Sequence, residues 1–120
     1  MGSNHLTTGE LGEKAAADFL ATNGYKIIAT RYRCKIGEID IIAWQGSTLV
    51  FVEVKTRRGY GYGAPGEAVG RAKQAKIIRT AQFYLRGKGL DDCRFRFDVT
   101  EIVVLGDKIS INHITNAFGG

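Results

Sequence analysis

The sequence predicts one α/β domain, and three observations support this prediction. The chain has 120 residues, which is an ordinary size for a single domain. Apolar residues make up 44% of the composition, enough to form a core without disulfides or a structural metal. Segments with helical and strand periodicity follow one another in the order α-β-β-β-α-β-β, with no linker and no internal repeat. We therefore expect a single domain over residues 1–120, with residues 1–8 flexible.

Two segments have the residue spacing of helices. The first is Gly9–Asn23, which Gly24 follows as a typical C-terminal stop. Just before it, Thr7 and Glu10 have the spacing of a capping box. The second is Glu67–Leu85, where apolar residues recur at intervals of three and four positions and a Gly-Lys-Gly sequence follows.

Five segments rich in β-branched and aromatic residues predict strands. The third contains an unbroken apolar run, Leu49–Val52, which indicates burial on both faces, as in a central strand. Turns at Gln45–Ser47 and Gly106–Asp107 are expected to form hairpins, and residues 57–66 form a glycine-rich loop. The expected strands are Tyr25–Arg33, Ile36–Gln45, Thr48–Thr56, Phe95–Leu105 and Lys108–Ile114.

The charge of the chain favours an anionic partner, nucleic acid first. The net charge is +5 and the pI is near 9.4. Basic residues concentrate between Lys55 and Lys88, where the only acid is Glu67. The alternative is a solvated helix face without a ligand.

The sequence predicts no membrane partner and a cytoplasmic location. No apolar run approaches the roughly 20 residues that cross a bilayer. The N-terminal residues lack the apolar core of a secretory signal. In a reducing compartment Cys34 and Cys93 are expected to be free thiols rather than a disulfide.

The second expected strand carries two acids among apolar residues. Because side chains alternate along a strand, Glu38 and Asp40 are expected to share one face. Ile39 and Ile41 are then expected to share the opposite face. The side chains of the acidic face either form a functional site or, in the plainer alternative, are simply exposed to solvent.

A third acid and a lysine lie on the following strand. Glu53 and Lys55 share a face there, and the turn at Gln45–Ser47 predicts antiparallel pairing of the two strands. This pairing places Asp40 opposite Val52 or Glu53. The two carboxylates can therefore meet at one end of the sheet, with Lys55 beside them.

Two carboxylates in a partly buried site repel each other and lose hydration, so the pair needs compensation. Three arrangements can supply it: a proton shared between the acids, an ion pair with Lys55, or a divalent cation. Oxygen ligands of this kind suit Mg²⁺ or Mn²⁺, which can polarise a phosphoryl oxygen and activate bound water. The plain structural alternative is a salt bridge at the end of a sheet.

Two motifs carry a resemblance to a known family. The first motif is Gly37–Asp40, with the sequence Gly-Glu-Ile-Asp, and the second is Phe51–Arg57, with the sequence Phe-Val-Glu-Val-Lys-Thr-Arg. Together they resemble the Asp…Glu-x-Lys signature of restriction-endonuclease-like nucleases. With the helical segment Gly12–Ala16, these motifs are similar to the YraN family, which is similar to archaeal Holliday-junction resolvases. The resemblance extends over nearly the whole chain, from Gly9 to about Val104.

The resemblance implies a restriction-endonuclease-like fold, with a central mixed β-sheet flanked by helices. It implies a divalent-metal site formed by Asp40 and Glu53, with Lys55 as the catalytic lysine. It places Glu13 near the metal as a further acid, and Gln74 near the site. The alternatives for these two are an exposed helix glutamate and an ordinary surface glutamine.

We expect a Mg²⁺- or Mn²⁺-dependent endonuclease that hydrolyses phosphodiester bonds in DNA, including branched DNA. A branched substrate favours a homodimer. The first alternative is a non-catalytic nucleic-acid-binding module, and the second is a protein-interaction adaptor that uses a sheet edge or Tyr60 and Tyr62. Phosphate contacts are expected from Arg57, Arg58, Arg71, Lys73 and Lys76.

Other patterns in the sequence predict no further site. Gly61–Gly66 matches G-x-G-x-x-G, but it begins several residues after a strand that ends in charged residues, so we expect no nucleotide cofactor. The histidines and cysteines lack the spacing of zinc ligands. Asp98 is expected to form a structural ion pair with Arg96, which lies on the same strand face.

Overall fold

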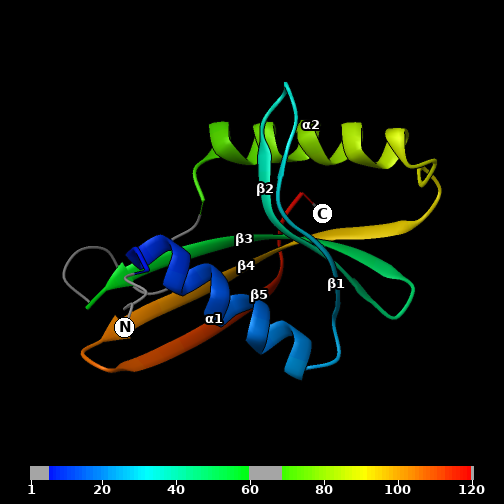
Figure 1. Cartoon of the computed structure of the whole chain (residues 1–120). Helices are drawn as coiled ribbons and strands as arrows, with labels where there is room; N and C mark the ends of the chain where they lie inside the picture. The colour runs from blue at the N-terminus through cyan, green and yellow to red at the C-terminus, as the bar shows by residue number, and fades with distance from the viewer. Residues whose placement is uncertain (1–5, 60–68, 120) are drawn as a thin grey trace.

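The computed structural model describes residues 6–59 and 69–119. Within these residues a five-stranded mixed sheet has the strand order β1-β2-β3-β4-β5, with one helix on each face (Figure 1). β3 and β4 are parallel, and all other neighbouring strands are antiparallel. The predicted α/β class and element order are confirmed. The elements are α1 (Thr8–Thr22), β1 (Lys26–Arg33), β2 (Glu38–Gln45), β3 (Thr48–Arg58), α2 (Arg71–Gly87), β4 (Arg94–Leu105) and β5 (Lys108–Phe118).

The predicted capping box fixes the N-terminus of α1. The backbone amide of Glu10 donates to Thr7 Oγ1 at 3.1 Å, and the amide of Thr7 donates to Glu10 Oε1 at 2.9 Å. These bonds satisfy two amides that a helix end otherwise leaves unpaired. The helix begins at Thr8, the last residue of the segment expected to be flexible, and residues 1–5 of that segment lie outside the described part of the chain.

The hairpin of β2 and β3 sets the register of the two acids. Its two-residue turn contains Gly46, whose φ of +59° is readily adopted by glycine. The last pair before the strands part is Ile41 with Val52. One position beyond this pair, Asp40 follows the register toward Glu53 rather than Val52. The second of the two predicted registers is therefore the observed one.

Several element boundaries differ from the prediction, by up to four residues. α2 begins at Arg71 rather than at Glu67, which lies outside the described residues. β3 continues through Arg58, where the sequence predicts a loop, because its parallel pairing with β4 runs to that residue. β5 continues beyond its predicted end to Phe118, whose ring stacks on Phe97 with centroids 5.2 Å apart.

β3 is the central strand between two apolar layers. Leu49 and Phe51 pack in a buried cluster with residues of α2, whereas Val50 and Val52 pack in a second cluster with residues of α1. The predicted burial on both faces is confirmed. Burial of apolar surface thus holds the two helices on opposite faces of the same strand. Neither helix of residues 6–59 and 69–119 is long and apolar enough to cross a membrane.

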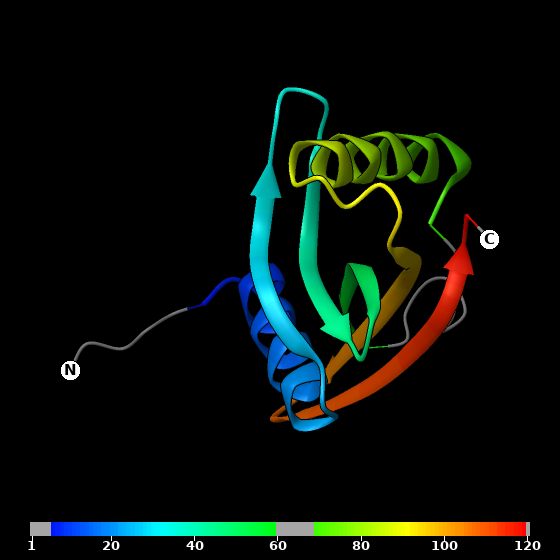
Figure 2. The same ribbon diagram turned by 90° about the vertical axis from the view of Figure 1, so that its right-hand side faces the viewer.

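The regular alternation of side chains fails where β1 and β2 pass the acids. Ile39 packs in the cluster with α2 and Ile41 in the cluster with α1, so the prediction that they share a face is wrong. The neighbouring strand is irregular at the same point, because Arg31 lies between the register partners of Ile41 and Ile39 and has a φ of +53°. A left-handed residue within a strand interrupts the regular pleat of the hairpin. The hairpin of β1 and β2 rises out of the sheet toward α2 (Figures 1 and 2).

A buried polar network connects β4 and β5. Asp98 is fully buried and accepts hydrogen bonds from Arg96 Nε at 2.9 Å and from the amide of Asn116 at 2.9 Å. His113 Nε2 lies 2.8 Å from Asp98 Oδ2, and His113 Nδ1 lies 2.7 Å from Thr100 Oγ1. Burial alone raises the pKa of Asp98, but the bonds with His113 and Arg96 hold it below its ordinary value. The predicted ion pair is confirmed, within a larger network.

Replacing Asp98 by Asn is expected to lower the free energy of unfolding at neutral pH by about 2 kcal/mol, because Arg96 loses a buried anionic partner. The pKa of Asp98 is lower in the folded state, so its stabilisation is complete above the unfolded pKa, near about 4. It is lost as the pH falls through the folded pKa. Urea unfolding measured from about pH 7 to about pH 3 should show the two proteins converging in stability. A difference that stays constant over this range would contradict the assignment.

Candidate active site

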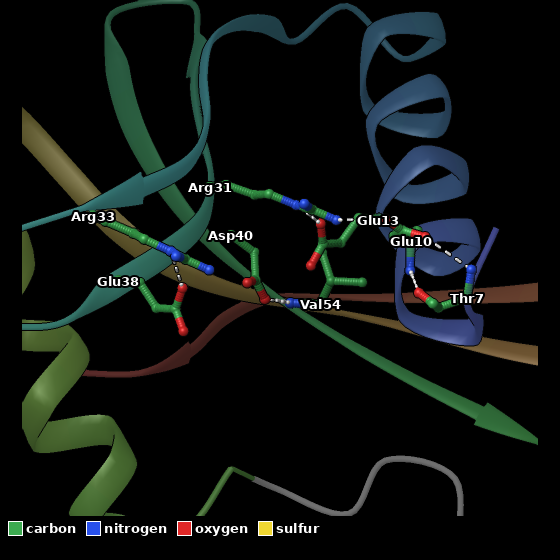
Figure 3. A network of polar contacts seen from close by, with 8 residues as sticks. All are labelled: Thr7, Glu10, Glu13, Arg31, Arg33, Glu38, Asp40 and Val54. Atoms are coloured by element: carbon green, nitrogen blue, oxygen red, sulfur yellow. Dashed lines mark hydrogen bonds and ion pairs between the residues drawn. The ribbon is translucent and has the colours of Figure 1, made fainter.

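Asp40 of β2 and Glu53 of β3 come together where the two strands part. Glu53 is 5% exposed and Asp40 is half-buried. The amide of Val54 donates a 2.8 Å hydrogen bond to Asp40 Oδ2, in a part of β3 that β2 no longer pairs (Figure 3). The carboxyl group of Glu53 lies near enough to that of Asp40 to act on it electrostatically. The structure thus brings together the two acids that the sequence analysis assigned to a metal. We call Asp40 and Glu53 the acid pair.

The acid pair carries more negative charge than its surroundings compensate. Burial, and then the neighbouring carboxylate of Glu53, raise the pKa of Asp40 to about 7. The charge of Glu13 adds to the rise, and the hydrogen bond from Val54 opposes it. Without a bound cation the acid pair therefore retains a proton close to neutral pH. A divalent cation can replace that proton and compensate both carboxylates.

Within the described part of the chain, one ammonium group contacts the acid pair, and it comes from α2. Lys73 Nζ forms an ion pair with Glu53 Oε2, and this hydrogen-bonded contact raises the pKa of Lys73. Lys55 is half-buried and lies two residues after Glu53 on β3. Among the described residues the Lys55 side chain forms no ion pair. The sequence analysis considered an ion pair between Lys55 and the two acids, but Lys73 forms this ion pair instead. The amine of Lys55 takes no part in it.

Glu13 approaches the acid pair from α1 but is held by an arginine. Arg31 Nε donates to Glu13 Oε1 at 2.7 Å, and another guanidinium nitrogen lies 3.9 Å from Glu10 (Figure 3). The bond with Glu13 raises the pKa of Arg31. Glu13 therefore acts on Asp40 through its charge, while its carboxylate is already paired.

The acid pair has the donor set for a Mg²⁺ or Mn²⁺ ion held by two carboxylates. In residues 6–59 and 69–119 no group of three or more His, Cys, Asp or Glu side chains could hold a metal. The three acids assigned to the metal from the sequence thus do not form one cluster. Two are sufficient, because Mg²⁺ is usually bound by one or two protein carboxylates and completed by water and substrate phosphates. Asp40 and Glu53 are the residues that could supply such hard oxygen ligands.

Two other predicted site residues, Gln74 and Arg58, have hydrogen-bond partners outside the acid pair. Gln74 Nε2 donates to the carbonyl of Val69 at 2.6 Å, so its amide is engaged at the start of α2. Arg58 Nε donates to Thr8 Oγ1 at 2.9 Å at the start of α1. The side chains predicted to bind phosphate lie at the end of β3 and along the first turns of α2: Arg57, Arg58, Arg71, Lys73 and Lys76.

A groove of 740 Å³ lies between the β1–β2 hairpin and α2. Lys73 and Lys76 line it from the helix, and Arg33 lines it from the hairpin. One acid, Glu38, also lines it and is paired with Arg33 at 3.0 Å. Lys73 lines this groove and also pairs with Glu53, so one residue connects the groove to the acid pair.

The hairpin meets α2 at a glycine. A Cβ atom added at Gly37 would lie 2.8 Å from Thr80 Oγ1 and 3.3 Å from Lys76 Cγ. The first distance is shorter than real Cβ contacts allow. Glycine therefore lets the hairpin rest directly on the helix, and this contact fixes one end of the groove.

Comparison with known proteins places the chain in a family. Residues 12–102 match the Uncharacterised protein family UPF0102. The chain belongs to this family. UPF0102 is the YraN family of the sequence resemblance, so that assignment is confirmed.

A UPF0102 protein of Symbiobacterium thermophilum is 52% identical over 111 residues, covering 92% of this chain and 94% of the relative. One of Alkaliphilus metalliredigens is 50% identical over 110 residues, covering 92% and 96%. One of Caldanaerobacter subterraneus is 45% identical over 118 residues, covering 96% and 97%.

Sequence reasoning missed the contacts of two basic residues of this UPF0102 chain. It assigned Lys73 only to phosphate binding and gave Arg31 no place in the site, whereas they pair with Glu53 and Glu13. No local pattern indicates either contact, because each partner lies on a different element. The available signal is indirect, since two acids that meet in a partly buried place require a cation from somewhere in the fold.

Proposed function

We propose that this chain is a divalent-metal-dependent endonuclease that hydrolyses phosphodiester bonds in DNA. The observation that carries the proposal is the acid pair, in which the half-buried Asp40 meets the buried Glu53 where β2 and β3 part, with Lys55 following on β3. A carboxylate with a raised pKa lowers the stability of the folded protein at neutral pH. A cation at the acid pair offsets this loss, which supports a functional reason for keeping both acids.

The residues of the site have separate roles in the proposed reaction. Asp40 and Glu53 hold the Mg²⁺ or Mn²⁺ ion, which when bound polarises a phosphoryl oxygen and lowers the pKa of water. Val54 orients Asp40 through its backbone amide. Lys55 projects from the same strand two residues after Glu53 and stabilises the negative charge that develops on the phosphate.

The basic groove supports a nucleic acid as the substrate. Its helix wall carries Lys73 and Lys76, and the chain as a whole has a net charge of +5. Contacts of this kind bind the phosphate backbone without reading base sequence. We include branched DNA among the substrates and a homodimer as the form that acts on it, as the resemblance to resolvases implies. The free cysteines, Cys34 and Cys93, are compatible with action in the cytoplasm.

A cleavage assay on four-way-junction and linear duplex DNA with Mn²⁺ tests this proposal. We expect the unaltered protein to cut DNA and EDTA to stop it. Lys55→Gln removes the amine that faces the developing charge, so its rate should fall about 100-fold or more. Asp18→Asn is the matched control, because it removes an exposed carboxylate of α1 that pairs only with Lys14 among the described residues. Its rate should not change.

Two outcomes would count against the proposal. Undiminished cleavage by purified Lys55→Gln rules out the role given to Lys55. Binding of DNA without cleavage, unaffected by Mn²⁺, favours the non-catalytic nucleic-acid-binding module. In that case DNA binding would still weaken as the salt concentration rises. The slope of log affinity against log salt concentration would steepen by about 0.9 for each phosphate of duplex DNA that the protein neutralises.

A further inference from the structure

We infer that Lys73 is a built-in competitor of the metal ion: its ammonium group takes the cation position at the acid pair, and a divalent ion must displace it. The inference rests on the proposed metal site. Its basis is the ion pair between Lys73 Nζ and Glu53 Oε2. In the described residues this is the only ion pair to either member of the acid pair, so the competition occurs at one contact.

The two partners of this ion pair differ in their freedom to move. The Glu53 side chain is 6% exposed, and its strand is flanked by the parallel strand β4, where Val99 is its register partner. The Lys73 side chain is 55% exposed and belongs to the first turn of α2. Exchange of cations therefore requires only the lysine to swing away, while the carboxylates keep their places.

The groove offers the displaced ammonium group a second place. Lys73 lines the groove together with Lys76 and Arg33. A phosphate bound there gives Lys73 an anion to replace Glu53. Metal at the acid pair and phosphate in the groove then favour each other, because each removes the competitor that opposes the other. An ion pair with a purely structural role would have no such link between the two ligands.

Lys76 provides a matched control for this competition. It lies one turn further along the same helix, is exposed and lines the same groove, but among the described residues it forms no ion pair with Glu53. Removing either lysine changes the net charge equally. Only removal of Lys73 frees the carboxylate of Glu53.

Calorimetric titration of Mn²⁺ into the whole chain measures the competition without any activity. We expect Lys73→Met to bind Mn²⁺ about tenfold more tightly than the unaltered protein, while Lys76→Met changes the dissociation constant less than about threefold. Lys73→Arg keeps a positive charge at the site and should bind as weakly as the unaltered protein. Far-UV circular dichroism of each variant confirms that it is folded.

The outcomes separate this inference from the proposed function. Equal Mn²⁺ affinity in Lys73→Met and Lys76→Met, or weaker affinity in Lys73→Met than in the unaltered protein, overturns the competition and leaves the metal site in place. If neither the unaltered protein nor any Lys73 or Lys76 variant binds Mn²⁺, and the unaltered protein gives the same titration as Asp40→Asn, the metal site is overturned. The competition is then overturned with it.

Discussion

Replacing Asp40 by Asn is expected to lower the rate of Mn²⁺-dependent DNA cleavage about 100-fold or more. The same substitution is expected to stabilise the folded protein at pH 7. The neutral amide cannot compensate a cation as a carboxylate does. Its oxygen can still accept the hydrogen bond that Val54 donates to Asp40. The substitution therefore removes the charge of the acid pair while keeping the hydrogen bond that positions it.

The expected gain in stability follows from the raised pKa of Asp40. In the folded state this pKa is about 7, above the ordinary value for the unfolded chain, so between these values the folded protein binds more protons. Stability consequently falls as the pH rises toward 7 and stays low above it. Asn has no such loss, and we expect its free energy of unfolding at pH 7 to exceed that of the unaltered protein by roughly 1 to 3 kcal/mol.

Urea unfolding from about pH 5 to about pH 8, with parallel cleavage assays, measures both effects. The advantage of Asp40→Asn should grow as the pH rises across this range. The exposed substitution Asp18→Asn should show neither effect, since its carboxylate is 70% exposed. Retained cleavage would remove Asp40 from the site, and an Asn variant less stable than the unaltered protein at pH 7 would contradict the charge imbalance of the acid pair.

Replacing Gly12 by Ala is expected to lower the free energy of unfolding by about 3 kcal/mol, despite the better helix propensity of alanine. Gly12 is buried in α1, where the helix crosses β3. A Cβ atom added there would overlap the side chain of Thr56, including the Thr56 Cβ at 2.7 Å. A Cβ atom cannot rotate out of the way, so α1 or β3 must shift.

Gly9 supplies the control for this prediction. It lies in the first turn of the same helix, and a Cβ added there meets nothing within 4 Å. Gly9→Ala should therefore leave stability unchanged or slightly higher. Thermal and urea unfolding of both variants give the comparison. Equal stability of the two variants would show that the helix moves away from Thr56 without loss.

Much of this fold could be predicted because its signals are local. The capping box, the turn with Gly46 and the apolar run through β3 each reside in a few consecutive residues, and each specifies its own element. The boundaries at Arg58 and Phe118 could not be predicted. They depend on pairing with β4 and on a ring contact with Phe97, both of which join distant parts of the chain.

In the candidate site too, local features could be predicted from the sequence, whereas contacts between distant elements could not. The spacing of strand residues and the position of the turn were enough to bring Asp40 and Glu53 together. The partners of these acids were not predictable, because Lys73 reaches Glu53 only after the crossover from β3 to β4 places α2 over the sheet. The left-handed backbone of Arg31 was not predictable either, since arginine seldom adopts it.

The direct contact of Gly37 with α2 determines how a ligand can enter the space beside it. With only a hydrogen atom between hairpin and helix, the two walls already touch at one end and cannot close further. The groove is therefore already at its minimum width at this end, and binding of a chain cannot narrow it there. A methyl group at position 37 would push the hairpin and the helix apart.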